Sequence, residues 1–185
     1  WYDIRLTHAD PRDNWDRSNG RIYRLKAKDT APAKPFDLAQ QSGDQLVENL
    51  SSPNKWLRQQ SLRVLGDRRD TALVPKLVKL IAENSRQLAL EALWALNLSG
   101  GFSEDSASHT LNHSDPFVRL WTVRLLGDAM SAPPEMASKL ARMAATEPNL
   151  EARGQLASTA RRLPAKAALP IVRNLLGREE DAADN

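Results

Sequence analysis

From about residue 36 to residue 177, apolar residues recur at the three- and four-residue spacing of amphipathic helices. A pattern of helix, short turn and helix returns about every 30 positions, as it does in stacked helical repeats. Residues 54–67 align with residues 115–128 at an offset of 61, and shorter copies begin at residues 88 and 148. We therefore predict an all-α fold, an α-solenoid of about four helix pairs.

Each repeated segment follows another amphipathic stretch, which we predict to be the first helix of its pair. Residues 88–98 are apolar except for Glu91 and Asn97, so this helix must be covered on most sides, as expected for a unit inside a stack. Residues 165–176 are predicted to be the opening helix of a fifth unit or a cap. The four first helices are expected at residues 43–50, 72–83, 103–111 and 134–146.

The two ends of the chain follow other patterns. Trp1–Thr7 and Arg21–Lys26 alternate apolar and polar residues with period two, and Ser18-Asn19-Gly20 between them is a turn signal. Because two strands alone are marginally stable in water, we predict a short β-hairpin-like remnant of a larger sheet. The predicted organisation is a strand remnant at 1–28, a Pro-rich linker at 29–35, a helical repeat domain at 36–177 and a disordered acidic tail at 178–185.

The basic excess of the chain lies outside the predicted helical part. Residues 1–35 contain eight Lys or Arg and five Asp or Glu, which is the whole net charge of +3, whereas residues 36–185 contain eighteen of each. A nucleic-acid interface needs a concentrated basic surface that displaces counterions, so the neutral helical part favours protein partners over nucleic acid. No run approaches the roughly eighteen apolar residues of a membrane span, and we predict no membrane insertion.

The sequence contains no motif that specifies a reaction. Cysteine is absent, which excludes disulfides, thiolate zinc sites and covalently attached c-type haem on this segment. There is no Gly-x-Ser-x-Gly nucleophile motif and no Gly-rich phosphate loop. We therefore expect no cofactor, no metal and no catalytic residue here.

Two polar clusters admit a metal-site interpretation beside a simpler one. His109 and His113 have a spacing that can share a metal, but residues 112–115 are a predicted turn and no third ligand is evident. The acidic loop at residues 8–16 lacks the central Gly and terminal Glu of an EF-hand. We expect solvated polar segments at both places.

Three of the second helices begin with a polar residue that is followed four positions later by an arginine. These pairs are Asn54/Arg58, Asp115/Arg119 and Asn149/Arg153. They resemble the polar ladder of HEAT repeats, in which the first residue caps the second helix and the arginine reaches a neighbouring unit's turn. The solenoid is therefore predicted to be HEAT-like, with a break in the second unit, where Ala89 stands at the arginine position.

A more specific resemblance covers the whole chain. Trp1–Asp3, Asp16–Arg24, Asn54–Arg58 and Leu65–Asp70 resemble the large membrane-bound dehydrogenases abundant in planctomycete-type bacteria. In that family a sorbosone- or glucose-dehydrogenase-like β-propeller precedes HEAT repeats and a cytochrome c region. The resemblance implies that strands 1–28 end a propeller, and that the parent protein is exported or periplasmic. It also implies that the parent oxidises a sugar or alcohol and passes electrons to haem, with none of those reactive parts in these residues.

The repeat register also predicts a partner-binding stripe. Residues three apart share a helix face, and three equivalent pairs fall on successive second helices, which line the concave side of HEAT-like stacks. Trp and Arg are favoured interface residues, so we predict contact with another domain or a partner protein. The alternative is that both Trp rings only seal the seam between helices. The three pairs are Gln60/Arg63, Glu91/Trp94 and Trp121/Arg124.

Two function classes compete with a non-catalytic scaffold. Some helical-repeat proteins are DNA glycosylases, and Glu91 between Trp94 and Trp121 offers an acidic residue beside aromatic ones. The net charge of zero in residues 36–185 opposes that interpretation. A free-standing adaptor is the other class, which the orphan strands at residues 1–28 disfavour.

Overall fold

The computed structural model describes residues 25, 28–29 and 36–181. The chain divides into two units, Trp1–Phe36 and Asp37–Asn185, within one residue of the predicted boundary. The predicted strand remnant and the predicted linker lie almost entirely outside the described residues. The helical unit is therefore the part of the chain whose architecture can be followed from sequence to function.

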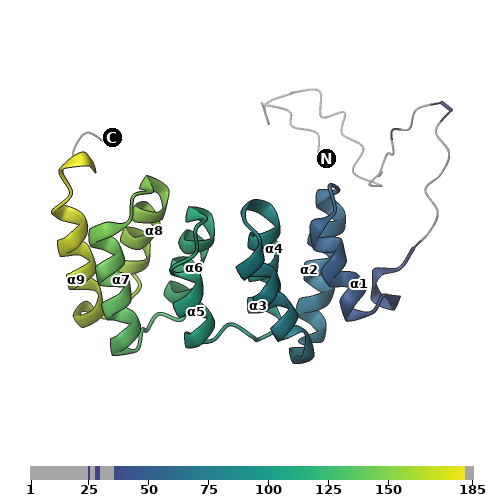
Figure 1. Ribbon diagram of the computed structural model, residues 1–185, viewed down its shortest axis with the longest axis horizontal. Coiled ribbons are helices and arrows are strands. Elements are labelled where there is room, and N and C mark those ends of the chain that lie inside the picture. Colours follow the sequence, from purple (N-terminus) through teal and green to yellow (C-terminus); the bar gives the residue numbers. More distant parts are fainter. Residues whose placement is uncertain (1–24, 26–27, 30–35, 182–185) are drawn as a thin grey trace, which may run out of the picture. The chain divides into compact units, whose positions relative to one another are not determined.

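The helical unit confirms the predicted all-α, solenoid-like fold, and no strand occurs in its described part. Four helix pairs follow one another, and a further helix packs beside the first helix of the fourth pair. The second helices contact one another in order along the stack, and Figure 1 shows the pairs following one another along the long axis of the helical unit. The helices are α1 (Gly43–Glu48), α2 (Lys55–Arg68), α3 (Val74–Glu83), α4 (Arg86–Leu98), α5 (Glu104–Thr110), α6 (Pro116–Asp128), α7 (Pro134–Thr146), α8 (Leu150–Ala160) and α9 (Ala165–Leu176).

The predicted caps begin the second helices. The side-chain oxygens of Asn54, Asp115 and Asn149 each accept a hydrogen bond from a backbone N–H in the first turn, at 3.0, 2.9 and 2.9 Å. Each bond satisfies one of the donors that a helix start leaves free. Proline at the first position of α6 and of α7 adds a backbone already set for helix.

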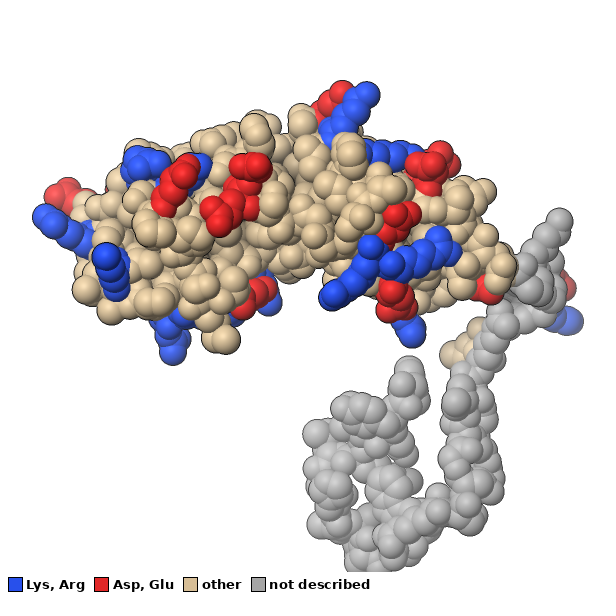
Figure 2. Space-filling view, turned by 90° about the horizontal axis from the view of Figure 1, so that it is seen from below, with Lys and Arg blue, Asp and Glu red and all other residues tan. Residues whose placement is uncertain are grey.

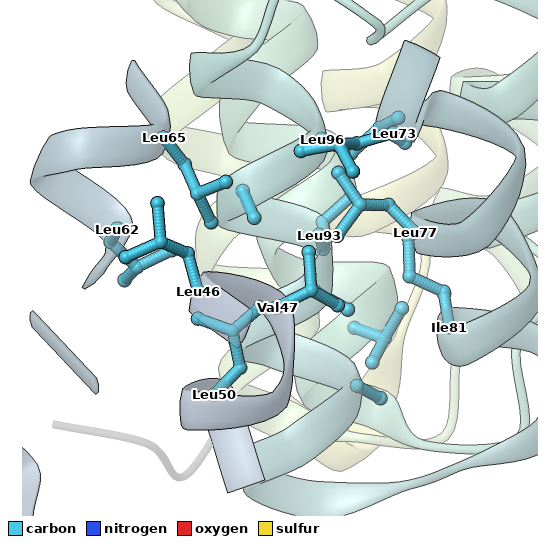
Figure 3. Close-up of a cluster of buried hydrophobic side chains, with 14 of the residues drawn as sticks. Leu46, Val47, Leu50, Leu62, Leu65, Leu73, Leu77, Ile81, Leu93 and Leu96 are labelled. Atoms are coloured by element: carbon cyan, nitrogen blue, oxygen red, sulfur yellow. The ribbon is translucent and has the colours of Figure 1, made fainter. Parts of the chain in front are cut away.

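Two clusters of buried apolar side chains lie one after the other along the stack. The first is built mainly from the first two helix pairs and also contains Val118 of α6; Figure 3 shows its leucines converging from α1 to α4. Leu46, Leu77 and Leu93 in it are fully buried. The second cluster joins α5 to α9 around Leu140 and Leu156. No single pair could bury its apolar side alone, so neighbouring units stabilise one another.

Two glycines at equivalent repeat positions let second helices approach closely. A Cβ atom on Gly66 would lie 3.3 Å from the Cβ of Leu98, and one on Gly127 would lie 2.8 Å from atoms of Thr159. In α4 the equivalent position is Asn97. Glycine therefore permits close contact between α2 and α4 and between α6 and α8. The contact between α4 and α6 has no glycine at this position.

The end of the chain differs from the sequence prediction of a disordered tail from residue 178. Glu179–Asp181 form a 3-10 helix, η4, and Asp181 receives hydrogen bonds from Arg153. The tail therefore begins with an ordered segment, because its acidic residues provide the carboxylate that the last ladder arginine needs. Residues 182–185 lie outside the described part.

Candidate functional site

The three ladder arginines share one geometry. Each donates from Nη1 to the two backbone carbonyls just before its own helix, at residues five and six positions earlier. Each also donates from Nε to a carboxylate 28 to 33 residues later in the chain, at 2.7 to 2.8 Å. The ladder therefore ties a turn to the following unit. The carboxylate partners are Glu91 for Arg58, Glu147 for Arg119 and Asp181 for Arg153.

Glu147 is the most enclosed of the carboxylates whose ionisation the structure shifts. Burial acts to raise its pKa, but hydrogen bonds from Arg119 and from the backbone N–H of Asn149, with the charges of Arg119 and Arg153, hold the pKa below its ordinary value. The same bond to Glu147 raises the pKa of Arg119. The pair is thus held in its charged form at neutral pH.

In the second unit Ala89 stands where the other units have the ladder arginine, and the carboxylate that such an arginine would bind is also replaced. Glu147 accepts from the backbone N–H of Asn149, two residues later, and His113 Nδ1 accepts from that of Asp115 in the same way, both at 3.0 Å. His113 therefore occupies the carboxylate position of its unit. With no arginine to bind, its Nε2 lies 2.9 Å from the carbonyl oxygen of Ile81 and donates to it.

This geometry bears on the metal interpretation of His109 and His113. Both ring nitrogens of His113 are engaged, so the ring holds the turn and offers no free lone pair to a metal. Across residues 36–181 no three His, Asp or Glu side chains form a group that could hold a metal ion. The acidic loop at residues 8–16 lies outside the described residues.

A groove lies along one face of the second helices, between α2, α4 and α6. Its volume is about 650 Å³, and its walls are mostly apolar with several amide side chains. We call it the second-helix groove. It is lined by Lys55, Arg58, Gln59, Leu62, Gln87, Glu91, Trp94, Asn97, Leu98, Trp121 and Leu125.

The groove brings together the aromatic part of the predicted stripe. The rings of Trp94 and Trp121 meet edge to face, with centroids 5.0 Å apart and planes at 74°. The guanidinium of Arg124 lies over the ring of Trp121, 5.0 Å from its centroid. Both Trp residues are half-buried and pack against the first apolar cluster, so they close the α4–α6 seam as well as line the groove.

The α2 part of the stripe lies differently. Gln60 and Arg63 are on α2, but the residues of α2 that line the groove are one position earlier in each case, Gln59 and Leu62. Arg63 is exposed and lies 3.9 Å from Asp67 on its own helix. Aligning the repeats identifies equivalent positions on the second helices. It does not show which side of α2 faces α4, and that side determines which residues line the groove.

Glu91 is less accessible than the sequence interpretation assumed. Its side chain is 3% exposed, and Oε1 accepts from Arg58 Nε and from Gln87 Nε2, both at 2.8 Å. Within the described part of the chain, Glu91 Oε2 and Trp94 Nε1 are buried without a hydrogen-bond partner. A carboxylate for Arg58 could not be located from sequence, because it comes from the middle of the next second helix.

Comparison with known proteins gives no identification: no protein family, characterised protein or solved structure matches the chain. None of the helices in the described residues has the length and apolar character needed to cross a membrane. On the face drawn in Figure 2, basic and acidic side chains alternate among uncharged ones without a patch of one sign. That face therefore shows no basic patch of the kind that nucleic-acid binding needs.

Proposed function

We propose that the helical unit is a non-catalytic scaffold that holds other protein parts in place, and that it contacts them through the second-helix groove. The observation that carries the proposal is the pair of Trp94 and Trp121 lining an accessible groove, with Arg124 stacked on Trp121. Half-exposed tryptophans beside arginine are typical anchors of protein interfaces. The ionised groups of the ladder are meanwhile occupied in tying units together, which supports a structural role for them.

The context that we propose is a large exported or periplasmic dehydrogenase-like protein. In it, the scaffold separates a propeller that oxidises a sugar or alcohol from a region that carries haem. The support for this context is the resemblance of Trp1–Asp3, Asp16–Arg24 and Leu65–Asp70 to that family. The partner of the groove is then another domain of the same chain, or a protein bound to it.

Site-specific photo-cross-linking tests the scaffold function. A benzophenone side chain replaces Leu98, which lines the groove and is 42% exposed, in the complete protein that contains this chain. The matched control replaces Val78 on α3, which is 37% exposed and does not line the groove. We expect cross-links from position 98 to reach peptides outside residues 36–181, and those from position 78 to be rare.

Equal yields from the two positions, or cross-links confined to the helical unit, would contradict the proposal. A fluorescence titration with duplex DNA at low and moderate salt addresses the glycosylase class. Tight binding that falls steeply as salt rises would favour that class over the scaffold. We expect weak binding, because residues 36–185 carry no net charge.

A further inference from the structure

The last helix of the stack, α9, has an apolar stripe that lies exposed in the described part of the chain. Leu169, Val172 and Leu176 follow one another at three- and four-residue spacing, so they share one face of the helix. Leu169 is 65% exposed and Leu176 is 82% exposed, whereas Ile171 is fully buried in the second apolar cluster. Single exposed apolar residues are ordinary, but three in register indicate a face that packs against another element. We call these three residues the α9 stripe.

Repeat equivalence relates the α9 stripe to a face of α7. Pro133 and Pro164 each stand directly before the first residue of their helix, so positions 31 apart in α7 and α9 are equivalent. The buried residues agree with this alignment, because Leu140 of α7 then corresponds to Ile171 of α9, and both are fully buried. The residues of the stripe correspond to those of α7 as follows: Leu169 to Ser138, Val172 to Ala141 and Leu176 to Ala145.

On α7 the equivalent face is covered by a helix. Ser138 and Ala141 line the hollow between α7 and α9, and the carbonyl oxygen of Ala141 accepts a hydrogen bond from Asn174 of α9 at 2.7 Å. Figure 1 shows α9 beside α7 at the end of the helical unit. By the same register, the α9 stripe is the surface on which another helix would lie along α9, as α9 lies along α7.

The size of the stripe residues indicates that α9 does not simply close the stack. A helix that caps a repeat array presents a polar outer face, which keeps the end of the array soluble. The stripe of α9 is instead more apolar than the equivalent face of α7, with Leu, Val and Leu in place of Ser, Ala and Ala. Burial of these larger side chains would contribute more to a helix–helix contact than burial of their counterparts does.

The charged residues of α9 specify what borders the apolar face of the partner helix. Lys166 and Arg173 are exposed, lie three and four positions from Leu169, and have no ion-pair partner in the described part of the chain. α9 contains no acidic residue, and two of the three acids that follow it, Glu180 and Asp181, are paired with arginines. Acidic flanks therefore complement the stripe, whereas a second copy of α9 would place basic residues against basic ones.

We propose that the α9 stripe binds an amphipathic helix of another protein part, whose apolar face is flanked by acidic residues. The apolar residues of this helix pack on the stripe, and its carboxylates pair with Lys166 and Arg173. The second-helix groove has no lining residue on α9, so the two surfaces are separate. The inference thus adds a second contact surface to the proposed scaffold, and each contact can be tested without the other.

Binding of labelled helical peptides to the 185-residue chain, followed by fluorescence anisotropy, tests the inference. The acidic probe has Leu at three- and four-residue spacing with Glu at neighbouring positions. A second probe has Lys in place of Glu, and a third has the composition of the first with its Leu residues dispersed around the helix. We expect the acidic probe to bind and to gain helical circular dichroism, and the other two to bind at least roughly tenfold more weakly.

Polar substitution of the stripe should remove the binding site. Leu169→Gln combined with Leu176→Gln should weaken binding of the acidic probe by roughly tenfold or more, because the apolar contact is lost. Both leucines are exposed, so the helical circular dichroism of the chain should be unchanged. Leu98→Gln in the second-helix groove is the matched control, and should leave binding unaltered.

Charge reversal provides a second arm that leaves the leucines in place. Lys166→Glu combined with Arg173→Glu should invert the preference, so that the Lys probe binds more tightly than the acidic probe. Lys79→Glu on α3, also an exposed position, should leave the preference for the acidic probe as it is. This arm stays informative if the leucine substitutions disturb folding.

Failure of the acidic probe to bind, or binding that is lost with Leu98→Gln and kept with the substitutions on α9, would overturn the inference. Dimerisation of the unaltered chain in sedimentation velocity that disappears in the double Gln variant would assign the stripe to a second copy instead. Binding to phosphatidylglycerol vesicles that disappears in the same variant would assign it to a membrane surface. None of these results alters the cross-links expected from position 98, so the scaffold function stands or fails separately.

Discussion

Single atoms decide how closely the second helices approach one another. Gly127 faces Thr159, whose hydroxyl also donates to the carbonyl oxygen of Val123 at 3.1 Å. Gly154, in the middle of α8, has no atom within 4 Å of the place where a Cβ would stand. The two glycines therefore differ in packing, because a side chain at Gly127 would meet the neighbouring helix and one at Gly154 would not.

Gly127→Ala should destabilise the protein by about 1–3 kcal/mol, because the new methyl group displaces Thr159. Gly154→Ala should stabilise it by about 0.5–1 kcal/mol, because it removes freedom from the unfolded chain without a clash. Urea unfolding followed by circular dichroism measures both changes. Equal effects of the two substitutions would show that the α6–α8 contact is looser than described.

The ionisation of Glu147 predicts the acid sensitivity of the fold. Its pKa is lowered in the folded state, so the unfolded state binds a proton more tightly and acid favours unfolding. The stabilisation is complete above the ordinary carboxyl pKa of about 4, and is lost as pH falls below it. Asp181, whose pKa is lowered chiefly by the hydrogen bond from Arg153, acts in the same direction.

Glu147→Gln should therefore make the urea midpoint less dependent on pH between about 5 and 3. The variant should also be less stable at pH 7, by about 3 kcal/mol, since it leaves the mostly buried Arg119 without its charge partner. Gln substitution of Glu48, an exposed residue with no ion pair in the described part of the chain, is the control. A pH dependence as steep as that of the unaltered protein would contradict the assignment.

At the scale of elements, the repeat is maintained by matched residues in neighbouring units. The seam between the third and fourth units has Arg119 with Glu147, whereas the seam before it has Ala89 with His113. Ala89 and His113 are matched to each other, because a carboxylate at position 113 would have no arginine to bind. Asp115 compensates in part, since it accepts from the backbone N–H of Arg86 across the same seam.

A double-mutant cycle tests this pairing. Ala89→Arg alone buries a charge without a partner, and His113→Glu alone places a carboxylate near Asp115 without an arginine, so each should destabilise the protein. Together they recreate the ladder, and we expect a favourable coupling energy of at least about 1 kcal/mol. Unfolding free energies of the four proteins give the coupling, and additive effects would contradict the assigned equivalence.

Much of this level of structure could be predicted from the sequence. The alignment at an offset of 61 identified the capping residues Asn54 and Asp115 and the ladder arginines Arg58 and Arg119. It could not identify Glu91 or the ordering of Asp181, because those partners depend on how far one unit is displaced from the next. Position 113 aligns with Glu147, so the sequence does contain a signal for the role of His113 in its turn.

At the scale of the whole molecule, the account depends on which surface meets other protein parts. Replacing both Trp121 and Arg124 with Ala should lower cross-linking from position 98 by roughly tenfold, as expected for loss of an interface anchor. The helical circular dichroism signal should persist, because Arg124 is exposed and Trp121 is half-buried. Loss of the helical signal would instead support a purely structural role for the Trp pair.

The candidate site was only partly accessible to sequence reasoning. The juxtaposition of Trp94, Trp121 and Arg124 followed from the repeat register, and the structure brings these three together. The positions of Lys55 and Gln59 in the groove could not be predicted from the repeat register. They depend on how far apart neighbouring second helices lie, which determines the side of α2 that lines the groove. The predicted strands at residues 1–28 remain a prediction, since they lie outside the described residues.

Hydroxyl-radical footprinting of the groove tests the central claim most directly. Oxidation of Trp94, Trp121 and Leu98 is compared between the 185-residue chain and the larger protein that we propose contains it, with the exposed Met130 as internal reference. The account predicts severalfold protection of the three groove residues in the complete protein, with Met130 unchanged. Equal oxidation of the groove in both forms would show that no protein part covers it, and would contradict the scaffold function.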